Sequence, residues 1–262
     1  MFKGFNVKYP EYEVILPQTH LSFTVRSMNV QEEERLKGSL VTPSKITEHL
    51  NKCLYDAIVN KPEIITDYRS FLENVSMKDR DALLYGLYHI TYEEVRNYNV
   101  TCGSCGKEYP VTVKVSDIFN FKEYPGNDIF EKREIIELPL TTGVTAVIKQ
   151  PKLSDELEII NRLGSIVSSN LDAISEVLII DSFRQDITEQ KEPVIYNDQQ
   201  DVLDAYLTLP AKDKRDIHTR YREVFGQYGI ELKMRSNCKY CGYEENIDID
   251  LVTNFFRQVY SA

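Results

Sequence analysis

The stretch "NVTCGSCGKEYPVTV", residues 99–113, carries two of the five cysteines of this 262-residue chain in a C-x-x-C-G turn. A structural zinc site takes four protein ligands in a tetrahedron, so two thiolates cannot complete one. If this turn binds zinc, a second pair of ligands must lie elsewhere in the chain.

A second turn of the same kind occurs near the end of the chain, in "RSNCKYCGYEENIDID" at residues 235–250. Cys238 and Cys241 follow Cys102 and Cys105 by 136 residues each, and alternating apolar residues follow both turns. The segments "SMKDRDALLYGLYHI" and "PAKDKRDIHTRYREVF", which precede the two turns, also resemble each other. We therefore expect an internal pseudo-repeat of helix, approach strand, cysteine turn and strand.

The chemistry of the two turns favours a structural zinc ion as the cofactor. Zinc accepts four thiolates at about 2.3 Å, and two C-x-x-C turns supply four, as they do in zinc ribbons. Glycine after each pair can adopt the left-handed conformation that closes a tight turn. The predicted metal ligands are Cys102, Cys105, Cys238 and Cys241.

Two other interpretations of the cysteines remain open. A C-x-x-C pair with a lowered thiolate pKa could exchange disulfides, as in a thiol oxidoreductase. This is less favoured because the cysteines follow extended segments, and because one redox couple needs only one pair. Four ordinary reduced cysteines are the third interpretation. Cys53 lies beside a predicted apolar helix stripe, which indicates a buried thiol with no ligand role.

Composition and charge exclude several classes of protein. A hydrophobic fraction of 42% with 27% charged residues is typical of globular proteins. The net charge of −10 opposes a sequence-independent grip on phosphate backbones, so nucleic acid is not expected as the main partner. No apolar window reaches the length of a membrane span, and the first residues do not resemble a secretory signal, so we expect a cytosolic location.

The first third of the chain predicts a strand pair followed by helices. Alternating apolar residues in "YEVILPQTHLSFTVRSM" indicate a hairpin. A short helix is expected after Asn29 as N-cap, ending at Gly38, and a longer one from Thr42 and Pro43 to just before Pro62, with Ile58 on its apolar stripe. Ser76 and Asp79 then resemble a capping box that begins a further helix.

The middle of the chain predicts a hairpin and more helices. We expect strand, turn and strand over "REIIELPLTTGVTAVIKQP", with Pro139 at an edge or bulge, and a strand that includes Val111, Val113 and Val115. Helices are expected at 153–164, 170–183 and 198–209, with a linker at 184–198. The fold class is α+β, in regions 1–75, 76–119, 120–205 and 206–262 that form one compact unit, with a two-turn, four-cysteine module resembling a zinc ribbon.

No motif in the sequence predicts catalysis. The four histidines, His20, His49, His89 and His218, form no metalloprotease motif and do not suggest a base beside a nucleophile. Glycine-rich phosphate loops are missing from the sequence as well. Because a closed four-cysteine site leaves no open coordination position, no catalytic residues are expected.

Taken together, these elements resemble the baseplate hub assembly proteins of T4-like tailed bacteriophages. The resemblance rests on "EEERLKGSL", "ITEHLNKCLYDAI", "KDRDALLYGLYHI", "VTVKVSDI" and "CKYCGYEENIDIDLVTNFF", and it spans residues 13–256. It implies a non-enzymatic protein that helps to build the baseplate hub, with other hub and tail proteins as partners. It also implies a place in the host cytoplasm during assembly and leaves open whether the protein stays in the virion or forms an oligomer.

The runner-up from another class is a zinc-ribbon protein that binds nucleic acid or assists transcription. Such a protein would carry a basic, aromatic-rich stripe around its cysteine turns. The acidic "GYEENIDID" after the second turn opposes this interpretation on one side.

Overall fold

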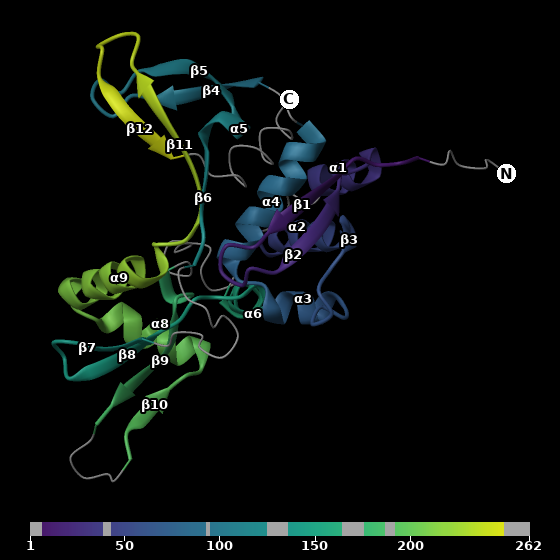
Figure 1. Ribbon diagram of the computed structural model, residues 1–262. Helices are drawn as coiled ribbons and strands as arrows, with labels where there is room; N and C mark the ends of the chain where they lie inside the picture. Colours follow the sequence, from purple (N-terminus) through teal and green to yellow (C-terminus); the bar gives the residue numbers. More distant parts are fainter. Residues whose placement is uncertain are drawn as a thin grey trace.

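The computed structural model describes residues 7–38, 43–92, 95–124, 136–163, 176–186 and 192–248. Within these residues the fold is α+β with several small antiparallel sheets (Figure 1). We call residues 7–124 the first half and residues 136–248 the second half. Figure 1 shows two lobes, each formed mainly by one half, with the two cysteine-bearing hairpins side by side at one end. The helix of residues 153–163, from the second half, lies against helices of the first half.

The N-terminal strand pair predicted from sequence is confirmed. Strands β1 (Glu11–Ile15) and β2 (Ser22–Arg26) are antiparallel, and β3 (Ile58–Asn60) adds to the far side of β2. Alternate side chains point to one face, as strand geometry requires. That face carries Val14, Phe23 and Val25, all buried.

Helices accompany this sheet in the described part of the first half, and the first of them begins as the sequence predicts. The Glu32 backbone N–H donates to Asn29 Oδ1 at 3.0 Å, and the Glu32 carboxylate accepts from the Asn29 N–H at 2.9 Å. This reciprocal pair confirms Asn29 as the N-cap. The helices are α1 (Val30–Gly38), α2 (Pro43–Asp56), α3 (Tyr68–Asn74) and α4 (Met77–Tyr92).

The second helix ends earlier than its apolar stripe predicts. Helix α2 stops at Asp56, and Ile58 belongs to β3, where it pairs with Val25 of β2. The prediction of helix up to Pro62 was therefore wrong, because pairing with a distant strand outweighs the helical spacing of one isoleucine. Thr42, the expected N-cap, lies outside the described residues.

Helix α4 packs on β1 and β2 and forms the centre of the first core. Its capping was predicted in part: Ser76 Oγ accepts from the Asp79 N–H at 3.1 Å. The Asp79 carboxylate instead accepts from the Gln18 N–H at 2.8 Å, in the turn between β1 and β2. Gly86 permits the close approach of the sheet, since a Cβ there would lie 2.3 Å from Val14 Cγ2.

The second half contains a four-stranded sheet in the order β10-β9-β8-β7. The predicted hairpin is confirmed, and Pro139 lies in the edge strand, where its missing N–H breaks no ladder. The strands are β7 (Ile136–Pro139), β8 (Val144–Ile148), β9 (Ile180–Gln185) and β10 (Val194–Tyr196).

Two predictions for this region were wrong in part. The helix expected at 170–183 gives way to β9 from Ile180, and the expected linker 184–198 contains the end of β9 and all of β10. Short apolar runs do not distinguish helix from strand, and here β9 is held between two neighbouring strands. Residues 170–175 and 187–191 lie outside the described part of the chain.

The remaining helices of the second half agree with the sequence. Helices α6 and α8 confirm the expectations at 153–164 and 198–209, and α9 is the expected helix before the second cysteine turn. The second core includes Phe183, Leu203, Ile217 and Phe225, all buried. The helices are α6 (Leu153–Leu163), α8 (Gln199–Thr208) and α9 (Ala211–Phe225).

Long strands carry the chain to and from the cysteine turns. Strand β11 pairs with β6 near its start and with β12 near its end, so one strand joins segments from both halves. The prediction that Val115 belongs to the strand of Val111 and Val113 was wrong, because Val115 is the first residue of the short helix α5. The elements are β4 (Val95–Thr101), β5 (Glu108–Lys114), α5 (Val115–Ile118), β6 (Phe119–Lys122), β11 (Gly229–Asn237) and β12 (Glu244–Asp248).

Several local contacts recur at corresponding places in the two halves. In the first hairpin, Leu16 begins the turn and His20 has a φ of 54°; in the second, Leu140 begins the turn and Gly143 has a φ of 79°. Each residue of positive φ donates its N–H to the leucine carbonyl, at 3.0 and 3.1 Å respectively. The two turns therefore make similar hydrogen bonds to a leucine, but the first turn is one residue longer and only the second uses glycine.

A second recurring contact joins an inner strand of each sheet to the helix that follows it. Arg26 at the end of β2 pairs with Glu32 in the first turn of α1, at 2.5 Å. Lys149, just after β8, pairs with Asp155 in the first turn of α6, at 3.3 Å. Asp155 also accepts from the Lys152 N–H at 2.8 Å, as Glu32 does from its own N-cap.

The division into four regions stays a prediction. Met77 lies against both core clusters, so the two halves share at least one side chain.

Among the described helices, none is both long and apolar enough to cross a membrane.

Candidate metal centre

The two cysteine turns are built by hairpins of the same register. In the first, Thr101 of β4 opposes Glu108 of β5; in the second, Asn237 of β11 opposes Glu244 of β12. Each pair lies directly before and after its turn, at positions 136 residues apart. Antiparallel pairing fixes the ends of each turn, so the cysteines of both turns leave their strands in the same way.

The backbone inside the turns is also the same. The Cys102 N–H donates to the Lys107 carbonyl at 3.0 Å, and the Gly106 N–H to the Cys102 carbonyl at 2.9 Å. The corresponding distances for the second turn are 2.9 Å, from Cys238 to Tyr243, and 2.8 Å, from Gly242 to Cys238.

Both turns close on a glycine in the left-handed region. Gly106 and Gly242 have φ values of 68° and 72°. Space is open around both positions, so glycine is favoured by the backbone conformation and not by crowding.

The structure brings the four predicted cysteines together in one cluster. Their Sγ atoms all lie within 4.8 Å of one another. The distance is 3.6 Å between Cys102 and Cys241 and 3.8 Å between Cys105 and Cys238. Both distances join one turn to the other and far exceed a disulfide bond, which is about 2.05 Å long.

These distances fit a four-thiolate metal site. Four sulfurs placed at about 2.3 Å from a central zinc in a tetrahedron lie about 3.8 Å apart. The cluster is therefore compatible with a structural metal ion, and its donors are all of the soft thiolate class that zinc accepts.

The cluster has a buried side and an exposed side. Cys102 and Cys238 are 2% and 1% exposed, whereas Cys105 and Cys241 face solvent. Beneath the buried pair, the Tyr109 hydroxyl and Ser236 Oγ lie 2.8 Å apart in a buried hydrogen bond. The hairpins are thus joined by packing and by this hydrogen bond as well as by the sulfurs.

The pKa values of the two cysteines in the second turn shift in opposite directions. Burial disfavours the thiolate of Cys238, but N–H groups of Tyr240 and Cys241 donate to it and lower its pKa to about 7. The Tyr243 N–H favours the thiolate of Cys241, yet burial and the neighbouring thiols outweigh it and raise the pKa of Cys241 to about 12. Of the two cysteines in the second turn, Cys238 is therefore the more acidic.

Contacts on the exposed side link the two turns further. The Gly103 N–H approaches both carboxylate oxygens of Glu245 at 3.2 and 3.3 Å, across the two hairpins. The ammonium groups of Lys107 and Lys239 each lie 5.0 Å from the centre of the Tyr240 ring, within cation–π range.

Tyr109, Ser236 and Glu245 also belong to this site, and none of them was predicted from the sequence. Their only signal is position, because each lies within four residues of a cysteine on a strand that leads to or from a turn. Contacts between two hairpins this far apart in the chain depend on how the hairpins meet, which no local pattern encodes.

The other candidate residues stand apart from this cluster. Cys53 is 8% exposed, and its Sγ lies 3.5 Å from Met28 Sδ, so the expected buried thiol is confirmed. His218 Nε2 lies 3.0 Å from the Tyr206 hydroxyl, and burial lowers the pKa of His218. His89 stacks on Tyr85 in α4.

Comparison with protein families gave one match over most of the chain. The model of a family described as "T4 bacteriophage base plate protein" matches residues 9–257. Searches of curated proteins and of solved structures found no match.

Proposed function

Because that match covers most of its length, this chain belongs to the T4 bacteriophage base plate protein family, and we propose that it is a non-enzymatic structural or assembly protein of the baseplate hub. It acts through contacts with other hub and tail proteins, in the host cytoplasm during assembly. The single observation that carries this proposal is the family match.

The second part of the proposal is that Cys102, Cys105, Cys238 and Cys241 bind one structural zinc ion. The support is the fit of the Sγ distances to a thiolate tetrahedron. Four protein ligands would leave zinc no open position for water or substrate, which suits a structural role. The residues of this chain supply the ligands, and the metal supplies a cross-link.

We further propose that the site is a zinc-ribbon-like module formed by an internal pseudo-repeat. The equal register and hydrogen bonding of the two hairpins support it, as do the matching contacts elsewhere in the halves. A metal that joins residues so far apart closes a long loop, and much of its binding free energy would appear as folding stability.

The experiment that tests the metal is the zinc content of the purified protein together with its native mass. We expect one zinc per chain in a monomer, and the same content in Cys53→Ala, because that thiol lies outside the cluster. Half a zinc per chain in a dimer would mean ligands from two molecules. Metal-free protein with disulfide-bonded cysteine pairs would overturn the zinc proposal in favour of redox chemistry.

The test of the hub assignment is a pull-down after co-expression with neighbouring tail proteins of the same phage. We expect at least one tail protein to copurify with the zinc-loaded chain. Failure to copurify with any of them, for a protein of full zinc content, would count against the hub role while leaving the metal site intact.

One surface feature favours the alternative function, a zinc-ribbon protein that binds nucleic acid. Lys107, Lys239 and Tyr240 form a small basic and aromatic surface at the tips of the hairpins. The net charge of −10 opposes nucleic-acid binding. Gel-shift measurements at low salt decide between the two, and we expect no shift with DNA or RNA.

A further inference from the structure

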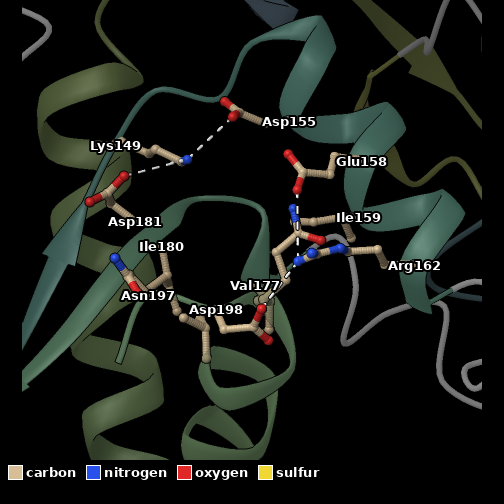
Figure 2. A pocket seen from close by; sticks show the side chains of 12 residues that line it. Lys149, Asp155, Glu158, Ile159, Arg162, Val177, Ile180, Asp181, Asn197 and Asp198 are labelled. Atoms are coloured by element: carbon tan, nitrogen blue, oxygen red, sulfur yellow. Dashed lines mark hydrogen bonds and ion pairs between the residues drawn. The ribbon is translucent and has the colours of Figure 1, made fainter. Parts of the chain in front are cut away.

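A polar pocket of about 420 Å³ lies in the second half, away from the cysteine cluster. Its wall is formed by α6, by β9 and by the start of α8 (Figure 2). The volume falls in the range of small-ligand and side-chain sites in proteins. No part of the proposed zinc site lines it.

The charged rim of this pocket has an excess of carboxylates. Lys149 Nζ lies 3.3 Å from Asp155 and 3.5 Å from Asp181. Arg162 lies 3.1 Å from Asp198 and 3.8 Å from Glu158. Figure 2 shows each cation between its two carboxylates. Four carboxylates against two cations leave the rim negative, which favours a positively charged ligand.

The floor of the pocket is aliphatic. Ile159, Val177, Ile180 and Val202 line it, and each is at most 5% exposed. Arginine and lysine side chains combine an apolar stem with a charged end, so an aliphatic floor under a carboxylate rim suits them.

Counting from matching helix caps pairs one residue of this floor with an aromatic side chain in the first half. Asp67 caps α3 and Asp198 caps α8, and counting from these caps matches Phe71 with Val202. Phe71 is fully buried, and its ring centre lies 5.5 Å from that of Tyr55. The same fold position is therefore filled by a ring in one half and by a smaller valine beside a pocket in the other.

We propose that this pocket binds an arginine or lysine side chain presented by a partner protein. The stem lies on the aliphatic floor, and the charged end joins the carboxylates, of which Glu158, Asp198 and Asp181 are all more exposed than Asp155. This inference deepens the proposed function and rests on it, because it names the chemistry of one partner contact.

The first test uses Nα-acetyl-arginine amide as the probe and Nα-acetyl-citrulline amide as its neutral control. Methyl NMR spectra of the zinc-loaded full chain are recorded during each titration. We expect saturable shifts of the Ile159, Val177, Ile180 and Val202 methyl signals with the arginine probe, at least fivefold weaker with citrulline. Equal shifts with both probes, shifts with inorganic phosphate instead, or none at all would each overturn the proposal.

The second test changes the pocket with matched variants. Val202→Phe introduces the residue that the first half carries at the matching position, and we expect it to fold and to lose the probe-induced shifts. Asp181→Asn should weaken probe binding at least threefold, whereas Glu63→Gln, an exposed carboxylate in the first half, should leave it unchanged. Unaltered binding in Val202→Phe would contradict the assigned site.

Zinc content is measured in every sample, so the two proposals fail separately. Loss of probe binding in fully zinc-loaded Val202→Phe concerns the pocket alone. Normal probe binding by a protein that does not copurify with any tail protein would leave the pocket standing and remove the hub role.

Discussion

Asp79 in the first half and Asp213 in the second half occupy the same helix position and accept similar hydrogen bonds, yet their pKa values shift in opposite directions. Each lies in the first turn of the helix that leads to a cysteine turn, and each accepts hydrogen bonds from the turn of a hairpin. Both are 0% exposed. Equal position and equal exposure therefore do not give equal electrostatics.

The difference lies in how deeply each carboxylate is packed inside the protein, because Asp79 lies much deeper than Asp213 although neither is exposed. Burial raises the pKa of Asp79 from 3.8 to about 6, against hydrogen bonds from Gln18 and Thr19 that favour the charged form. Burial also acts on Asp213, but the hydroxyl and N–H donors of Thr141 and Thr142 outweigh it and hold the pKa of Asp213 below its usual range. Both aspartates make similar hydrogen bonds, and the depth of burial decides whether desolvation or those bonds determine the direction of the pKa shift.

We expect the greatest loss of stability when the proposed zinc link between the two halves is removed. In Cys102→Ser or Cys238→Ser, one ligand is lost and zinc binding should fail, which destabilises both halves equally. With zinc in about 1,000-fold excess over Kd, the loss is about 4 kcal/mol, measured by urea unfolding with zinc and with a chelator. A single mutant that weakens only its own half would contradict a shared site.

Matched truncations in the two cores test whether the metal couples the unfolding of the two halves. Leu83 in α4 and Ile217 in α9 are both fully buried, and each substitution by alanine should cost about 3 kcal/mol. In zinc-loaded protein we expect one unfolding transition for either variant; in chelator, the truncated half should unfold first. Tyrosine fluorescence is a suitable probe, since the chain has no tryptophan and 17 tyrosines. Two transitions in the zinc-loaded protein would show that the metal does not couple the halves.

As the pH rises, the contributions of Asp79 and Asp213 to folding stability should change in opposite directions. As the pH rises from about 4 to about 6, the unfolded chain releases the Asp79 proton before the folded chain does. The Asp79 contribution to stability therefore falls over this window, by up to about 3 kcal/mol. For Asp213, whose folded pKa is depressed, the contribution is present above its unfolded pKa and is lost as the pH falls.

Paired variants isolate these two contributions. Asp79→Asn keeps an oxygen for the Gln18 N–H but cannot ionise, so it should flatten the slope between about pH 4 and 6 and raise stability at neutral pH. Asp213→Asn should instead lower stability at neutral pH, by about 1 kcal/mol, because hydrogen bonds to a neutral amide are weaker than those to a carboxylate. Urea unfolding at about pH 4.5 and 6.5 measures both, and parallel slopes would refute the contrast.

We expect the least change in stability from substitutions in the β1–β2 and β7–β8 turns. His20 adopts a positive φ that glycine adopts in the other half, so His20→Gly should relieve strain and Gly143→Ala should introduce it. Each change should alter stability by about 0.5–1 kcal/mol in opposite directions, after the entropy of glycine in the unfolded chain is counted. Thermal unfolding of the zinc-loaded variants measures it. Stabilisation by Gly143→Ala would show that the two turns are not equivalent.

The clustering of the four cysteines was more predictable from the sequence than the secondary structure was. The four cysteines could be paired because their motifs are local and lie at equal spacing, and the structure brings all four together. The helix caps at Asn29 and Ser76 were predictable for the same reason, since their hydrogen bonds run to residues three positions away.

Contacts between distant residues could not be predicted in this way. The end of α2 and the start of β9 are fixed by strands far along the chain, so the periodicity of Ile58 or of residues 170–183 misleads. The Asp79 carboxylate pairs with a turn 61 residues away instead of completing its own cap. The pocket gathers side chains from several elements, and its acidic rim looks in sequence like ordinary solvated helix surface.

The spacing of the cysteine turns has a consequence for synthesis on the ribosome. When Cys105 emerges, its partners Cys238 and Cys241 have not been made. At about 5–20 residues per second, the wait is roughly 7–27 s. Strand β6 waits similarly for β11. During this interval the nascent hairpin of β4 and β5 presents two thiols whose partners are not yet made, and β6 lacks the strand with which it pairs.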